Sequence, residues 1–338
     1  MLRRIILVAL ILFVTSCLIT VGARVESIRV GYFPNITHAQ AVIGMVEGQF
    51  QKGFDKVKIE PFLFNAGPSA MEALLAGELD IVYVGPNPAV NCYIKSEGTA
   101  LKIIAGACSG GAGLVVRGDV KIKKPNDLKG KRIATPQLGN TQDVALRAYL
   151  LNHKMGYLES GGDVQIMPTS NSNMLLLFQR KEVDAAWTVE PWVSRLIVDG
   201  GGRLYLDERE LWSGGRFTTA VVVASSRFIR EHPDWVRRWL AIHVALSRRI
   251  QQDPAWAKRV INKEMERVTG KPMPQSVLDQ AWSRLEITYD PLRGSLFKSA
   301  DQAYKLGFLG NKKPDLRKIY DLSFLKKILL REGLPELK

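Results

Sequence analysis

The chain has 338 residues, of which 46% are hydrophobic and 24% charged, which excludes disordered, collagenous and low-complexity proteins. Its length favours two lobes, and its three cysteines are too few for a disulfide scaffold or a multi-cysteine zinc module. The formal net charge of +14 comes from basic residues scattered through predicted helices without an aromatic-interleaved stripe, which argues against nucleic-acid binding.

The chain starts with the pattern of an export signal, a positive start followed by a short apolar run. The next residues, Val14-Thr-Ser-Cys17, resemble a bacterial lipobox, in which the cysteine thiol carries a diacylglycerol. We therefore expect a signal peptide over 1–16, a lipid anchor on Cys17 and a linker over 17–27. Cleavage after Ala23 and an uncleaved helix are the alternatives, although the run is short for a membrane span of about 20 residues.

Strands and helices alternate in the next part of the chain. Alternating apolar residues predict a strand over 28–33, and apolar residues at helical spacing follow over 37–50. Ser69-Ala-Met-Glu72 has the sequence of a capping box and predicts the start of a short helix that ends at Gly77. Further strands are expected over 57–64 and 80–84, with a helix over 89–95. This order indicates a parallel sheet flanked by helices.

A sequence repeat follows at an offset of 104 residues. Glu78-Leu-Asp-Ile-Val-Tyr83 matches Glu182-Val-Asp-Ala-Ala-Trp187, and the same offset places Thr37 on Thr141. It also places Ser69 near the start of one predicted helix and Asn173 near the start of another. We interpret the repeat as two lobes of similar plan, with chance similarity between short strand motifs as the alternative.

The returning strand pattern over 218–224 indicates that the chain leaves the first lobe and later re-enters it. The glycine-rich run Ser109-Gly-Gly-Ala-Gly113 lies between two other strand patterns, near the first crossing. Two crossing segments would form a hinge, and mostly helical sequence follows the returning strand. The expected division is a first lobe over 28–113 and 218–338, and a second lobe over 114–217.

The candidate ligand-binding residues follow predicted strands, where helix N-termini present unpaired backbone N–H groups. Amide, hydroxyl and backbone donors of this kind can hold an anionic oxygen without a cationic side chain. Simpler roles stay open for Asn140 as an N-cap, for His38 as a cap and for Glu190 as a carboxylate stabilised by its helix dipole. The candidates are Asn35, Thr37, His38, Asn87, Ser109, Gly110, Gly139, Asn140, Thr141, Gln142, Glu190 and Trp192.

Motifs for catalysis are missing from the sequence. No Walker loop, HExxH, CxxC or GxSxG is present, and the four histidines lack metal-ligand spacing. We therefore expect a binding protein without cofactor or metal rather than an enzyme. Cys92 and Cys108 could form a disulfide in an exported protein or remain two buried free thiols.

Seven motifs together resemble the solute-binding proteins of the nitrate, sulfonate and taurine class of ABC importers. That family also includes binders of thiamine-pyrimidine precursors. The resemblance implies an α/β type II periplasmic-binding fold, in which two lobes close around a solute and dock on permease subunits with a cytoplasmic ATPase. A lipid-anchored monomer in the periplasm or on the outer face of the cytoplasmic membrane is expected. The motifs are Val30–His38, Ala76–Ile81, Gly85–Pro88, Ala134–Asp143, Val183–Trp187, Glu190–Trp192 and Leu211–Phe217.

The expected function is capture of a small sulfonate-, nitrate- or taurine-like solute by hinge closure. Within the same fold, the alternative ligand is a pyrimidine or another aromatic heterocycle that stacks on Tyr83, Trp187 or Trp192. The same fold also occurs in enzymes of pyrimidine- and menaquinone-precursor biosynthesis, against which the export signal argues.

Overall fold

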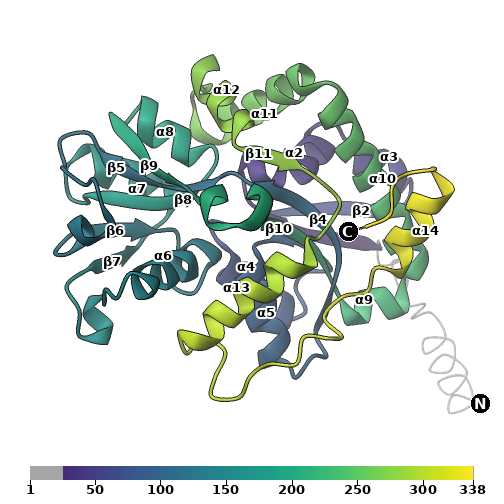
Figure 1. The fold of residues 1–338 in the computed structure, drawn as a ribbon. Helices are drawn as coiled ribbons and strands as arrows, with labels where there is room; N and C mark the ends of the chain where they lie inside the picture. The colour runs from purple at the N-terminus through teal and green to yellow at the C-terminus, as the bar shows by residue number, and fades with distance from the viewer. Residues whose placement is uncertain (1–25, 338) are drawn as a thin grey trace, which may run out of the picture.

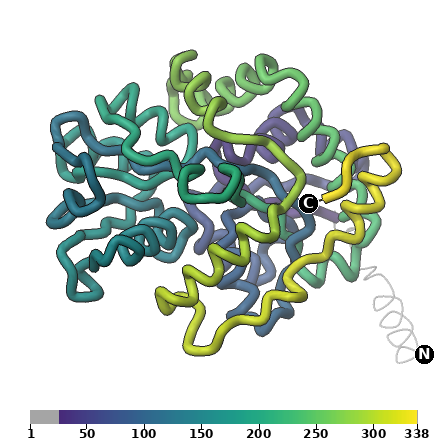
Figure 2. Tube along the Cα trace, in the orientation of Figure 1, coloured from purple at the N-terminus to yellow at the C-terminus, as the bar shows by residue number. Residues whose placement is uncertain are grey.

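The computed structural model describes residues 26–337, so the expected signal peptide, Cys17 and the cleavage site after Ala23 lie outside the described residues. The chain folds into two α/β lobes that lie side by side (Figure 1), each a sheet with apolar cores on both faces. This confirms the predicted fold class. Figure 2 shows that the purple start and the green-to-yellow end of the chain share one lobe, and that blue and teal residues form the other.

The sheet of the first lobe has the strand order β11-β4-β10-β3-β1-β2. β1 is parallel to β2 and β3, whereas β10 is antiparallel to β3 and β4. β3 is buried along its whole length, as its continuous apolar sequence predicts for a strand covered on both faces. The strands are β1 (Ser27–Tyr32), β2 (Lys58–Leu63), β3 (Ile81–Val84), β4 (Leu101–Gly110), β10 (Thr218–Ser225) and β11 (Leu285–Ile287).

The sheet of the second lobe has the order β7-β6-β8-β5-β9. β6 is parallel to β7 and β8, and β5 is antiparallel to β8 and β9. The order β7-β6-β8 therefore repeats the order β2-β1-β3. The strands are β5 (Ala112–Arg117), β6 (Arg132–Thr135), β7 (Gln165–Pro168), β8 (Ala185–Val189) and β9 (Gly202–Asp207).

Helices cover both faces of each sheet. The larger core of the first lobe contains Trp239, which is fully buried and stacks on Phe50 with ring centroids 3.7 Å apart. The α-helices are α2 (Ala39–Val46), α3 (Gln49–Gly53), α4 (Gly67–Leu75), α5 (Pro86–Lys95), α6 (Thr141–Asn152), α7 (Asn171–Gln179), α8 (Trp192–Val198), α9 (Ser226–Glu231), α10 (Pro233–Gln252), α11 (Pro254–Thr269), α12 (Gln275–Ser283), α13 (Arg293–Lys305) and α14 (Ser323–Arg331). Short 3-10 helices are η1 (Ile36–His38), η2 (Pro125–Leu128), η3 (Leu158–Ser160), η4 (Glu208–Leu211) and η5 (Ser213–Gly215).

The two lobes share one ion-pair arrangement. Asp80 precedes β3, and its Oδ2 accepts from the backbone N of Arg29 at 2.9 Å and from its Nε at 3.0 Å. Asp184 precedes β8, and its Oδ2 accepts from the backbone N of Arg132 at 2.9 Å and from its Nε at 3.4 Å. Each carboxylate thus ties the central strand of its lobe to the neighbouring strand, which confirms the internal repeat.

Three local expectations are corrected. The glycine-rich run is no loop, because β4 continues through Gly110, which pairs with Leu285, and β5 begins at Ala112. The three-residue strand β11 was not expected, since so short a run inside helical sequence shows no period of its own. The Ser69 capping box is absent: α4 begins at Gly67, and the Ser69 hydroxyl donates to the Ala66 carbonyl at 3.0 Å.

The two described cysteines are free thiols. Cys92 and Cys108 are both buried and belong to the cores on opposite faces of the first sheet. Burial raises the pKa of both thiols, that of Cys92 to about 12. The structure therefore has two buried free thiols and no disulfide between Cys92 and Cys108.

Removal of the Asp80 carboxylate is expected to destabilise the first lobe. Asp80→Ala removes the acceptor of Arg29 Nε, Nη2 and backbone N, and breaking a largely buried ion pair costs about 3 kcal/mol. Urea denaturation followed by tryptophan fluorescence measures the loss. Asp315→Ala is the matched control, because its pair with Arg317 is solvent-exposed on both sides and its removal should leave stability unchanged. Equal effects of the two substitutions would contradict the role of Asp80.

Candidate ligand-binding site

A small cavity lies between the lobes at the carboxyl ends of their parallel strands. Phe33 follows β1, Gly85 follows β3, Pro136 follows β6, and Val189 ends β8, and all four line it. Its volume is ≈ 30 Å³, and a single water needs about 10–15 Å³, so the cavity admits a group of a few heavy atoms. The other lining residues are Asn35, Thr37, His38, Asn65, Ala66, Gly67, Pro88, Asn140, Thr141, Gln142, Asn171 and Thr219, none of them acidic, lysine or arginine.

Four helices begin at this cavity. α4 starts at Gly67 and α5 at Pro86 in the first lobe, and α6 starts at Thr141 and α7 at Asn171 in the second. The positive ends of their dipoles and their first N–H groups favour negative charge there. α5 contributes few backbone donors, since Pro86 and Pro88 lack an N–H. The cavity is thus electropositive without a formal charge.

Two asparagine side chains present their amide nitrogen as a donor. The Oδ1 of Asn35 accepts from Trp192 Nε1 at 3.1 Å, a bond that joins the two lobes. The Oδ1 of Asn171 accepts from the Thr188 hydroxyl at 2.6 Å. Because each oxygen is occupied by a donor, the Nδ2 groups of Asn35 and Asn171 are the polar atoms left for a ligand.

His38 is a neutral donor. It is 2% exposed, and its Nδ1 accepts from the backbone N of Phe33 at 3.2 Å. Nε2 therefore carries the proton and can donate to a ligand. Burial lowers the pKa of His38 to about 3, so the ring stays uncharged in the whole neutral range.

The N-terminus of α6 combines capping with ligand contact. Asn140 accepts from the backbone N of Asp143 at 2.8 Å, so the simple N-cap interpretation of Asn140 is right, and Asn140 also lines the cavity. Asp143 is fully buried and accepts from Gly139 N at 2.9 Å and from Arg147 Nε at 3.0 Å. This network holds the loop in place. The Thr141 hydroxyl is buried without a hydrogen-bond partner in the described part of the chain.

The hydroxyl of Thr141 also lies against the opposite lobe. A Cβ added to Gly85 would overlap the Thr141 Oγ1. The lobes are therefore closed on each other at this point, and only glycine leaves room for the contact. The backbone of Gly85 has an ordinary φ of -67°, so the glycine is required by space and not by conformation.

A larger hollow adjoins the cavity on its outer side. Its volume is ≈ 420 Å³, and Asn35, Asn65 and Asn171 line both spaces. Arg195 is the charged residue of its lining and donates through Nε to Asp199 at 3.0 Å. Mostly apolar side chains form the remaining wall: Pro34, Phe64, Leu175, Leu176, Pro191, Trp192, Met265, Val268 and Met273, with Ser172 and Thr269.

Of the predicted site residues, Asn35, Thr37, His38, Asn140, Thr141 and Gln142 line the cavity together, and Trp192 lines the outer hollow. The other five bond to protein groups elsewhere. Asn87 pairs with Ser299, Ser109 accepts from Phe217 N, the Gly110 carbonyl accepts from Thr219, Gly139 donates to Asp143, and Glu190 pairs with Arg284.

The sequence interpretation missed several lining residues, and the repeat could have found some of them. Gly67 and Asn171 are 104 residues apart, start α4 and α7, and both line the cavity. The same offset relates Gly85 to Val189. Applied systematically, the repeat predicts matched lining positions from the two lobes.

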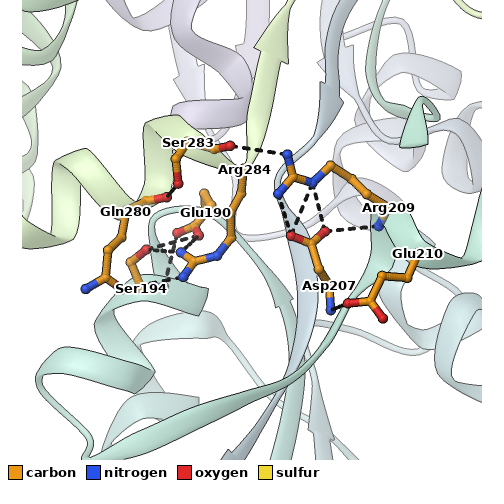
Figure 3. A network of polar contacts seen from close by, with 8 residues as sticks. All are labelled: Glu190, Ser194, Asp207, Arg209, Glu210, Gln280, Ser283 and Arg284. Atoms are coloured by element: carbon orange, nitrogen blue, oxygen red, sulfur yellow. Dashed lines mark hydrogen bonds and ion pairs between the residues drawn. The ribbon is translucent and has the colours of Figure 1, made fainter. Parts of the chain in front are cut away.

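Glu190 belongs to an ion pair beside the connection between β4 and β5 (Figure 3). Its carboxylate is fully buried and accepts from Arg284 Nη1 at 2.9 Å and from the Ser194 hydroxyl at 3.0 Å. The Arg284 carbonyl also accepts from the backbone N of Gly111, between β4 and β5. Burial raises the pKa of Glu190, and the charge of Arg284 opposes that shift. Arg284 of the first lobe thus binds the second lobe next to the point where the chain passes from β4 to β5.

The second crossing contains another buried carboxylate. Glu208 begins η4 between β9 and β10, is 2% exposed and accepts from Trp187 Nε1 at 2.8 Å. Burial raises the pKa of Glu208 to about 7. Its neighbour Arg209 binds Asp207 and donates to the Ser283 carbonyl at 3.2 Å, which links this crossing to the first lobe (Figure 3). Polar contacts thus link the two lobes beside both connecting segments.

Residues 26–337 contain neither a helix suited to a membrane span nor a cluster of metal-ligating side chains. No helix among them is long and apolar enough to cross a membrane. No group of three or more His, Cys, Asp or Glu side chains in the same range could hold a metal ion.

Glu208→Gln is expected to change how stability depends on pH. The folded-state pKa of about 7 lies above the ordinary 4.5, so the folded chain binds this proton more tightly than the unfolded chain. The free energy of unfolding of the wild type therefore falls between pH 4.5 and 7, by about 3 kcal/mol for the whole shift. Urea denaturation at pH 5 and pH 8 should show this fall, and the variant should lack it. Glu286→Gln, at an exposed carboxylate, should keep it; identical pH dependence in all three chains would refute the assignment.

The comparisons with known proteins agree with this architecture. The sequence model of the NMT1-like family matches residues 22–263. A putative binding protein of Brucella abortus (strain 2308) is 28% identical over 217 residues. The aligned region covers 64% of this chain and 64% of the length of that relative. The taurine-binding periplasmic protein of Escherichia coli (strain K12) is 29% identical over 174 residues, 52% of each chain.

A solved structure shows the same fold. The alkanesulfonate-binding protein of Xanthomonas axonopodis pv. citri, bound to MOPS, superposes with a TM-score of 0.71 at 22% identity, covering 85% of this chain and 95% of that one. The family match spans more than half of the sequence and includes the residues that follow β1, β3, β6 and β8 around the cavity. The chain therefore belongs to the NMT1-like family.

Proposed function

We propose that the chain is the extracytoplasmic receptor of an ABC importer and closes its two lobes around a small organic anion with an oxyanion head, such as a sulfonate. The observation that carries the proposal is the cavity between the lobes, which is lined by neutral donors from both and by four helix N-termini. The names of the taurine-binding relative and of the alkanesulfonate-binding structure support the same class of ligand.

The head of the ligand would accept hydrogen bonds from both lobes. His38 and Asn35 offer donors from the first lobe, and Thr141 and Asn171 from the second. Each donor is uncharged, so binding would discriminate by hydrogen-bond geometry and dipoles more than by net charge. Because the pKa of His38 is about 3, protonation of its ring would not change affinity between pH 5 and 9.

The tail of the ligand would lie in the outer hollow. Its Met, Leu, Phe and Trp side chains suit an alkyl or aryl group, and it opens from the same asparagines that bind the head. An inorganic anion such as nitrate would leave this apolar wall in contact with water. We therefore favour an organic sulfonate over nitrate as the solute.

The alternative ligand, an aromatic heterocycle, receives less support. Tyr83 and Trp187 are fully buried, and their polar atoms bond to His243 and to Glu208, so neither ring is a stacking surface in the cavity. Trp192 alone of the three lines the outer hollow. A biosynthetic enzyme on this fold is also less favoured, because the named relatives are binding proteins.

Ligand binding should depend on closure at Gly85. Gly85→Ala would place a methyl group on the Thr141 hydroxyl and hold the lobes apart, while its ordinary φ keeps the fold intact. A thermal-shift screen of the wild type against hexanesulfonate, taurine, nitrate and pyrimidines should show a shift of a few degrees with hexanesulfonate, since ligand at 100 times its Kd stabilises by about 2.7 kcal/mol. The variant should lose this shift but keep the melting temperature of the free protein.

Gly294→Ala is the matched control, because a Cβ there meets no atom within 4 Å. It should respond to hexanesulfonate like the wild type. If only a pyrimidine raises the melting temperature of the wild type, the ligand is the aromatic heterocycle and not a sulfonate. An unchanged shift in Gly85→Ala would show that ligand binding does not need the contact between Gly85 and Thr141.

We also propose that Cys17 carries the lipid that holds the receptor at the outer face of the membrane, where the permease lies. Cells grown with radioactive palmitate should label the wild type, and Cys17→Ala should abolish the label. Cys92→Ala is the matched control, because this buried thiol has no part in anchoring. Label retained in Cys17→Ala, or no label in the wild type, would disprove the lipid anchor.

A further inference from the structure

One end of the first lobe carries a cluster of exposed cations around an exposed leucine. We call it the basic end and define it as Arg237, Arg238, Lys326, Lys327, Leu330 and Arg331. It is built by α14, whose Leu325, Ile328 and Leu329 are buried against the core that includes α10. Figure 1 shows α14, α9 and β2 at the end of the molecule remote from the second lobe.

The outward face of α14 combines apolar and cationic groups. Leu330 is 82% exposed, the most exposed of the large apolar side chains in residues 26–337. It belongs to a hollow of ≈ 300 Å³ lined by Leu329, Leu330, Leu334 and Leu337, with Lys326, Lys327 and Glu336. An apolar groove with a lysine rim matches the chemistry of a phospholipid, whose headgroup is anionic and whose chains are apolar.

The cations of α10 extend this surface. Arg237, Arg238 and Arg331 line one further hollow together with Asp234. The acidic groups here are Asp234, which pairs with Arg237, Glu332, which pairs with Arg331, and Glu336. Among the described residues, five cations against these three carboxylates leave a positive excess, and exposed pairs of this kind are weak enough to exchange for lipid phosphates.

The start of the described chain lies at the same end. Lys58 N donates to the Glu26 carbonyl at 2.9 Å, which fixes the entry of β1 beside β2. Phe54, shortly before β2, contacts Trp235 at the start of α10, with ring centroids 6.4 Å apart. Eight residues, 18–25, separate Cys17 from Glu26, so the two Cα atoms can lie about 30 Å apart at most. The ligand cavity lies at the opposite, carboxyl end of β1.

We propose that the basic end binds the anionic headgroups of the bilayer, with Leu330 at the interface, and so keeps the receptor close to the membrane in which its permease lies. The inference that the basic end lies near the membrane depends on the proposed anchor at Cys17. The predicted affinity for anionic lipid does not depend on that anchor. With the anchor in place even a weak attraction would orient the protein, because the tether keeps the surface at high local concentration.

The test uses the chain from residue 18 onward, which lacks the anchor but keeps both lobes, whose cores lie within residues 26–337. It should sediment with vesicles of 30% phosphatidylglycerol in phosphatidylcholine and not with pure phosphatidylcholine, and 0.5 M NaCl should release it. The triple variant Lys326→Glu, Lys327→Glu and Arg331→Glu should bind at least tenfold more weakly, and Leu330→Ser should weaken binding at constant charge.

The matched control is Lys121→Glu, Lys123→Glu and Lys129→Glu, which makes the same charge change at exposed residues of the second lobe. It should bind vesicles like the unmodified chain. Equal loss in both triple variants would show that only the overall net charge acts, and no preference for phosphatidylglycerol would show that this surface serves another partner; either result overturns the proposal. If the full-length wild type takes up no palmitate while the chain from residue 18 still binds the vesicles, the anchor at Cys17 is refuted and the lipid affinity of the basic end stands.

Discussion

The arrangement of the two lobes depends on the contact between Gly85 and Thr141, beside a cavity lined by hydrogen-bond donors that have no acceptor in the protein. The Thr141 hydroxyl is buried against Gly85 without an acceptor, and leaving such a group unsatisfied costs about 1–3 kcal/mol. The closed arrangement is therefore incomplete by itself. A ligand oxygen at this point would remove the cost, so the closed state gains stability only when an acceptor from the ligand is present.

The internal repeat explains why donors from both lobes meet there. Parallel strands of both sheets end at the cavity, and each is followed by a loop and a helix N-terminus. Four pairs of lining residues stand 104 residues apart: Thr37 and Thr141, His38 and Gln142, Gly67 and Asn171, Gly85 and Val189. Half of the lining thus comes from equivalent positions in two copies of one plan, and each copy is braced by a carboxylate that ties two strands, Asp80 or Asp184.

Periodicity in the sequence predicted most of the fold, because alternation and helical spacing record burial, which is local in the sequence. It predicted the loops of the cavity for the same reason, since a strand end and a helix start can be recognised residue by residue. It did not predict which side chains bond to each other when they lie far apart in the sequence. Glu190 has the pattern of a ligand-facing carboxylate, yet Arg284, 94 residues further on, neutralises it in the structure. Asn87 is likewise bonded to Ser299, 212 residues away.

The division between repeated and unrepeated elements also bears on specificity. Half of the residues that line the inner cavity occupy repeated positions, whereas the outer hollow draws Met265 and Val268 from α11 and Met273 from the segment after it, which have no counterpart in the second lobe. Trp192 of this hollow is the repeat partner of Pro88, which lines the inner cavity. Changes in α11 or at Trp192 would alter the space for a tail without disturbing the donors for the head. Recognition of the oxyanion and selection of its substituent are therefore separable in this fold.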